Sequence, residues 1–181
     1  MDKIEIKGYK SFKELKLDLL PINILIGANG SGKSNFLSFF EFLNRLYEQK
    51  LTEYVALNGG MDKYFFQGSK TTDAIEATIC FEDSHYSFEL KEGDNRFVFS
   101  KERLGNNGLY TAIGAFGNEA SIKTYGGLSI GKHIRRYLSE IKKYHFHDTG
   151  KSSPFTKESH IVNDAYYLCL LYTSPSPRDT R

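Results

Sequence analysis

A glycine-rich stretch near the N-terminus has the residue types and the spacing of a phosphate-binding loop. Residues 27–34, GANGSGKS, match the pattern G-x-x-x-x-G-K-[ST] at every fixed position. A polyphosphate needs several donors that converge on it, and consecutive backbone N–H groups converge only where the chain wraps tightly. The glycines at 27, 30 and 32 permit this wrapping because they lack a Cβ. The motif therefore predicts a P-loop that holds the phosphates of a nucleotide.

The predicted ligands of this loop are amides, one ammonium group and one hydroxyl. Lys33 would place its cation between the β- and γ-phosphates, and Ser34 would offer its hydroxyl to Mg²⁺. The helix that follows would present its positive N-terminal end to the same anion. The expected cofactors are ATP and Mg²⁺. The binding residues expected from the motif are Gly27, Asn29, Gly30, Ser31, Gly32, Lys33 and Ser34.

The elements expected on either side of the loop are a strand and a helix. Residues 22–26 are almost wholly apolar, which predicts a strand covered on both faces. Residues 33–49 carry apolar side chains at helical spacing, which predicts a well-buried helix. Before them, alternation over 3–7 and 15–19 predicts two half-buried strands in an antiparallel pair.

From Ala74 onward the apolar pattern has a period of two. Alternating segments at 75–82, 86–90 and 97–99 are separated by turn sequences such as EGDN and GNNG, which predicts an antiparallel meander. The fold class expected is α/β: an incomplete N-terminal lobe of an ABC-ATPase-like P-loop NTPase with an antiparallel β-subdomain.

Beyond the meander, the sequence predicts a second helix over about 131–143, with Ser129 as its cap. Residues 144–147 predict a further strand. One domain is expected over 1–168. Residues 169–181 contain two prolines within three residues and lack either periodicity, so we expect a non-native or disordered tail there.

Composition indicates a cytoplasmic protein and excludes several classes. The 181 residues suffice for one domain, and a formal net charge of +2 does not by itself imply nucleic-acid binding. Cys80 and Cys169 form neither a disulfide framework nor a zinc pattern. The N-terminus lacks the apolar core of a signal peptide, and no run reaches the ~18 apolar residues of a membrane span.

Two segments resemble a known family. Residues 8–12, GYKSF, resemble the Gly-Phe-Lys-Ser-Phe segment at the N-terminus of SMC heads, and residues 23–35 resemble the strand, Walker A loop and trailing Asn of those heads. The chain is thus similar to the SMC/RecF/OLD-like branch of ABC ATPases, which includes stand-alone ATPases often labelled AAA-type. The match is specific over residues 1 to about 50 and vaguer from there to Leu168.

The resemblance implies an ATP-driven switch. In this family two heads sandwich two ATP molecules, and the Walker B acid and the signature motif follow the meander. It implies that Asn35 joins the nucleotide site, that the full-length protein engages as a homodimer of heads, and that DNA or an effector nuclease is a partner. It also implies that the chain holds only the N-terminal portion of the ATPase, with its catalytic residues unknown. A role in DNA maintenance or phage defence follows by analogy alone.

Several other residues are candidates for this site. Gln67 is the candidate for the glutamine that senses Mg²⁺ and the γ-phosphate, and Tyr9 or Lys13 for flanking the adenine or ribose; ordinary surface roles remain open for all three. The run at 79–83, ICFED, ends in paired acids, but their order is reversed and the flanks alternate. It is therefore not expected to be a Walker B strand.

The remaining motifs have simpler interpretations. His145 and His147 share a strand face with no third metal ligand nearby, so a half-exposed strand is expected. A second GKS, at 150–152, lacks the first glycine of the pattern. The basic residues around the second helix are expected to form a solvated face. Two other function classes stay open: a small P-loop kinase or GTPase, and a regulatory module that binds nucleotide without turnover.

Overall fold

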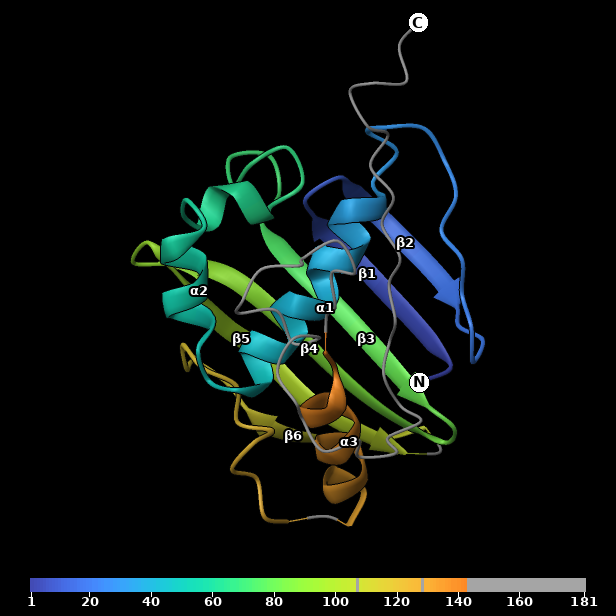
Figure 1. Ribbon diagram of the computed structural model, residues 1–181. Coiled ribbons are helices and arrows are strands. Elements are labelled where there is room, and N and C mark those ends of the chain that lie inside the picture. The colour runs from blue at the N-terminus through green and yellow to red at the C-terminus, as the bar shows by residue number, and fades with distance from the viewer. Residues whose placement is uncertain (107, 128, 143–181) are drawn as a thin grey trace, which may run out of the picture.

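A computed structural model describes residues 1–106, 108–127 and 129–142. Its centre is a single six-stranded antiparallel sheet with the strand order β2-β1-β3-β4-β5-β6 (Figure 1). The strands are β1 Lys3–Tyr9, β2 Phe12–Asp18, β3 Ala74–Phe81, β4 Ser84–Gly93, β5 Arg96–Asn106 and β6 Leu109–Gly114. Both the predicted N-terminal pair and the predicted meander are confirmed. They form one sheet because β1 pairs with β3, where Ile4 lies opposite Ile79.

Three α-helices lie on one face of this sheet (Figure 1). They are α1 Lys33–Tyr47, α2 Leu51–Leu57 and α3 Ser129–Glu140, and a short 3₁₀ helix, η1, spans Met61–Tyr64. α1 confirms the helix predicted after the loop. It ends where Gln49 adopts a left-handed φ of 59°, so the last residues of the expected 33–49 span lie outside it. α2 was not predicted, and α3 begins about two residues before the expected start.

The core between the helices and the sheet is rich in aromatic rings. Phe39 and Phe42 of α1 are fully buried, and the Tyr9 ring lies edge-on to both, with centroids 5.1 and 5.4 Å apart. Phe42 also packs edge-on against Phe97 of β5, at 6.0 Å. Such pairs add about 0.5–1.5 kcal/mol each beyond area burial. The helix that follows the phosphate-binding loop is therefore held firmly against the sheet.

The prediction of a strand at 22–26 is wrong. This segment is not part of the sheet, and the side chains of Ile22, Ile24 and Ile26 are 80%, 79% and 89% exposed. Only Leu25 packs against the core. An apolar run reports a preference for burial, but a strand also needs a neighbour for its backbone groups. None of the described strands pairs with this segment.

Several expectations concern residues outside the described ranges: the strand at 144–147 with His145 and His147, and the tail at 169–181. Among the described helices, none has the length and apolar character needed to cross a membrane.

Candidate nucleotide-binding site

The loop at 27–34 has the backbone shape that its glycines permit. Gly30 and Gly32 adopt left-handed φ values of 84° and 93°, where an L side chain would be strained. Gly32 is the N-cap of α1, and its carbonyl accepts the first helical hydrogen bond from the Phe36 N–H at 2.9 Å. The loop therefore runs directly into the positive end of a buried helix.

The Lys33 ammonium group lies within this loop. It donates to the Gly27 carbonyl at 2.6 Å, to the Ala28 carbonyl at 2.7 Å and to the Ser31 hydroxyl at 3.2 Å. An ammonium group has three N–H donors, so these contacts use all of them. An incoming phosphate would exchange some of these contacts for stronger charge-assisted ones. The cation thus lies on the loop before any ligand is bound.

The remaining predicted ligands lie in the open. Asn29, Ser31 and Ser34 are exposed, and Asn35 is partly buried in the first turn of α1. The carbonyl of Asn35 accepts a hydrogen bond from the Ser38 hydroxyl at 2.8 Å. The Ser34 hydroxyl, predicted to meet Mg²⁺, is thus accessible at the start of the helix. Among the described residues, no group of three or more His, Cys, Asp or Glu side chains could hold a metal ion by itself.

The turn between β1 and β2 touches the phosphate-binding loop. A Cβ on Gly32 would lie 3.1 Å from the Ser11 hydroxyl and 3.2 Å from the Phe12 ring. Glycine is therefore needed at this position both for its backbone angle and for this close approach. The two segments that resemble SMC heads, 8–12 and 23–35, are in contact in space.

Ser38 joins the same turn to α1. Its hydroxyl donates to Asn35, so it accepts from the Lys10 ammonium at 2.9 Å and from the Tyr9 hydroxyl at 3.1 Å. The Lys10 ammonium also lies 4.8 Å from the centre of the Tyr64 ring, a cation–π distance. Burial raises the pKa of Tyr9 far above its usual value, although the Ser38 contact opposes this.

The two candidates for flanking the base differ in burial. Tyr9 is fully buried, so its ring cannot flank an adenine or ribose, and that expectation is wrong. Lys13 is exposed in β2 close to the turn, and its role stays a prediction. Sequence patterning could not separate the two, because Tyr9 departs from the alternation of β1 and is buried by α1 and Tyr64.

Gln67 lies in the loop between η1 and β3. The preceding residue, Phe66, donates its N–H to the Gly8 carbonyl at 2.9 Å, and the Lys10 N–H donates to the Tyr64 carbonyl at 2.8 Å. These bonds attach the Gln67 loop to the turn that contacts Gly32. The predicted role of Gln67 toward Mg²⁺ stays a prediction.

The acids at 82 and 83 lie at the opposite end of the sheet. Ala74, at the start of β3, lies beside Gly8, whereas Cys80 lies opposite Lys3. At about 3.3 Å per residue, the eight residues of β3 place Glu82 roughly 25 Å from the end of the strand that lies beside Gly8. β3 is also antiparallel to both neighbours. This position agrees with the expectation that the run is not a Walker B strand.

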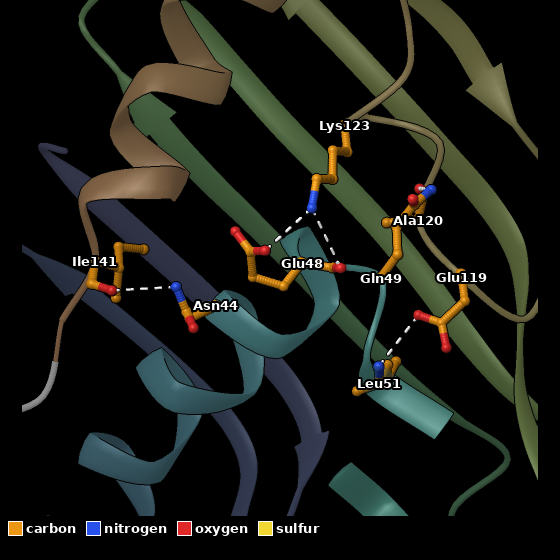
Figure 2. Close-up of polar contacts among 8 residues, drawn as sticks. All are labelled: Asn44, Glu48, Gln49, Leu51, Glu119, Ala120, Lys123 and Ile141. Atoms are coloured by element: carbon orange, nitrogen blue, oxygen red, sulfur yellow. Dashed lines mark hydrogen bonds and ion pairs between the residues drawn. The ribbon is translucent and has the colours of Figure 1, made fainter. Parts of the chain in front are cut away.

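Sequence reasoning missed the residues that position the far end of α1, which Figure 2 shows. The Glu119 carboxylate accepts the first two N–H groups of α2, from Leu51 and Thr52, both at 3.1 Å. The Gln49 amide donates to the Ala120 carbonyl at 3.0 Å, and the Lys123 ammonium pairs with Glu48 at 3.0 Å.

Asn44, on α1 itself, donates its amide to the Ile141 carbonyl just after α3, at 3.2 Å (Figure 2). These contacts join residues roughly 70 to 100 positions apart in the sequence, so no local sequence pattern predicts them.

Comparison with known proteins identifies the class. The AAA ATPase domain family matches residues 1–167, so the chain belongs to this family. The matched range includes the phosphate-binding loop, the sheet and all three α-helices. Together with the relatives below, this match supports an SMC/RecF-like, ABC-type ATPase region.

Curated relatives match shorter stretches. The chain is 32% identical over 92 residues to the chromosome partition protein Smc of Methanocaldococcus jannaschii, which covers 50% of this chain and 8% of that protein. It is 46% identical over 41 residues to the DNA replication and repair protein RecF of Lactococcus lactis, covering 22% of this chain and 12% of RecF. It is 44% identical over 48 residues to the tungstate uptake system ATP-binding protein TupC of Campylobacter jejuni, covering 26% of this chain and 14% of TupC. The chain therefore spans only a small part of each relative.

Proposed function

We propose that this chain binds ATP together with Mg²⁺ at residues 27–35. The observation that carries the proposal is the Lys33 ammonium group, held by two carbonyls of a loop that leads into a helix N-terminus. A positive side chain and a helix dipole at one place, beside a glycine-rich backbone, favour a polyphosphate over other anions. The ligands we propose are Gly27, Asn29, Gly30, Ser31, Gly32, Lys33, Ser34 and Asn35.

Each of these groups has a distinct task in the proposal. The amides from Asn29 to Lys33 turn toward the phosphates, and Lys33 leaves its carbonyl partners to meet the β- and γ-oxygens. The Ser34 hydroxyl and, at lower priority, Gln67 hold the metal. Bound Mg²⁺ would bridge phosphate oxygens and neutralise their charge. The buried aromatic face of α1 keeps the helix N-terminus fixed during this exchange.

For the full-length protein we propose an ATP-hydrolysing switch. We propose that two heads form a homodimer that engages on ATP, with DNA or an effector nuclease as the partner. The similarity to a chromosome partition protein and to a DNA replication and repair protein favours DNA. DNA maintenance and phage defence are the two settings we propose. Phosphoryl transfer depends on positioning and on a residue that orients water. The paired acids that follow β3 lie at the wrong end of the sheet, so we expect this chain alone to bind ATP but turn it over slowly.

Titration calorimetry with ATP and Mg²⁺ tests the site. Replacing Lys33 with Ala removes the cation, and we expect ATP affinity to fall at least about tenfold, since charge-assisted contacts contribute about 1.5–3 kcal/mol. Lys16→Ala, on the exposed edge of β2, removes the same charge away from the loop and should leave affinity unchanged. Equal affinity in Lys33→Ala and the parent would refute the proposed site.

A measurement of ATP hydrolysis separates the proposed ATP-driven switch from a regulatory module that only binds nucleotide. A regulatory module would bind ATP and show no hydrolysis in any longer form of the protein, whereas the switch would hydrolyse once its catalytic acid is present. A small kinase or GTPase is disfavoured by the antiparallel sheet in which both β1 and β3 lie.

A further inference from the structure

The two edges of the sheet differ sharply in charge. β2, at one edge, carries Lys13, Glu14, Lys16 and Asp18 within seven residues. β6, at the other edge, has the sequence LYTAIG and carries no charge. Natural sheets usually protect an open edge with charges, proline or a cover, because unpaired backbone groups there accept another strand. β2 has charged protection, whereas β6 has neither charge nor proline, and its one irregularity is a bulge at Ile113 near its end.

The β6 edge is also open and apolar. Its first four residues are exposed, with Leu109 at 79% and Tyr110 at 60%. From Leu109 to Ala112, β6 pairs with β5 in regular register, so the outward N–H and C=O groups of these residues are already aligned as a strand. No backbone hydrogen bond joins Leu109–Gly114 to any described residue outside β5. This differs from the apolar segment at 22–26, which has no strand partner to hold it in register.

We infer that β6 is a self-association surface, where a second copy of this chain adds its own β6 antiparallel to the first. A two-fold axis perpendicular to the sheet must lie midway between two copies of one residue, because paired residues of two antiparallel strands point to the same face. If that residue is Thr111, it faces its own copy and Tyr110 faces Ala112, within the regular part of β6. A threonine pair is a favourable cross-strand contact, and a large ring meets a small side chain.

Charge explains why the occupant is a second copy. An isologous contact brings each residue close to itself, so a charged edge such as β2 would place like charges together. β6 has no charge to repel its copy. The Tyr110 ring packs against the His85 ring, with centroids 4.6 Å apart. This side chain is therefore partly ordered before a second copy binds. The contact is small, so we expect dissociation on the order of micromolar.

Sedimentation equilibrium of the full chain, with and without ATP, tests this inference. The surface lies on the strand edge farthest from β1 and β2, so the dimer should form equally in both conditions. Thr111→Lys should weaken it by about tenfold or more, because like charges then meet at the axis. Thr111→Glu alone should weaken it similarly, whereas an equimolar mixture of the two variants should restore association. Ala56→Lys, on the exposed face of α2, adds the same charge elsewhere and should have no effect.

Four outcomes would overturn the inference. The first is a monomer at all concentrations up to about a hundred times the expected dissociation constant. The second is a dimer that Thr111→Lys leaves intact. The third is a dimer that is dispersed instead by Ile24→Lys, in the exposed apolar segment. Melting temperatures of the variants show whether each remains folded. A dimer that requires ATP would also refute the β6 contact while leaving the proposed nucleotide site untouched.

Discussion

Replacing Glu102 with Gln should destabilise the fold strongly, although the two side chains have almost the same shape. Glu102 lies in β5 and is only 1% exposed. One carboxylate oxygen accepts from the Tyr86 hydroxyl at 2.7 Å and from the Ile122 N–H at 3.0 Å. The other accepts from the Ser121 N–H at 2.8 Å. The carboxylate thus fixes the loop before α3 to the sheet.

The expected magnitude follows from these three bonds. Glutamine can keep the oxygen that serves Tyr86 and Ile122, but its NH₂ group would then face the Ser121 N–H, donor against donor. An unsatisfied buried donor costs about 1–3 kcal/mol, and a hydrogen bond to a charged acceptor contributes about 1.5–3 kcal/mol. We therefore expect Glu102→Gln to lower the free energy of unfolding by about 2–3 kcal/mol. Tyr86→Phe, which removes only one of the three donors, should cost about 1 kcal/mol.

Urea unfolding followed by circular dichroism provides the measurement. A lower midpoint at unchanged slope reports a change in stability. Glu92→Gln, on the exposed part of β4, makes the same chemical change outside the core and should alter stability by less than about 0.5 kcal/mol. If Glu102→Gln matches Glu92→Gln, the carboxylate does not hold the loop, and the reasoning fails.

Two further predictions concern carboxylates with different partners. Burial acts to raise the pKa of Glu89, but the hydrogen bonds from Lys101 and Ser100 and the Lys101 charge outweigh it and hold that pKa below the usual 4.5. A lowered pKa stabilises the fold above about pH 4.5 and loses this effect as pH falls through the folded value. Glu89→Gln should therefore reduce the acid-side loss of stability in urea titrations, and an unchanged pH profile would contradict this. Glu119→Gln removes the anion at the N-terminus of α2 and should cost about 1 kcal/mol. The first two amides of α2 should then exchange hydrogen faster, and unaltered protection would rule out the cap.

Short-range patterns in the sequence predicted the parts that depend on neighbours along the chain. The period of two over the strands and the helical spacing after Lys33 identify β1 to β5 and α1, because alternation reports which side chains face the core. The left-handed glycines of the phosphate-binding loop were likewise expected from the motif. Their conformation depends on a few consecutive residues and on the absence of a Cβ.

The tertiary structure decided the features that depend on residues far apart in the chain. It joined the hairpin and the meander through β1 and β3, buried Tyr9 against α1 and left 22–26 without a strand partner. It also placed Glu119 at the start of α2, 68 positions away in sequence. A periodic pattern states that a face will be buried but not which surface will bury it, because pairing and packing are settled by the whole chain at once.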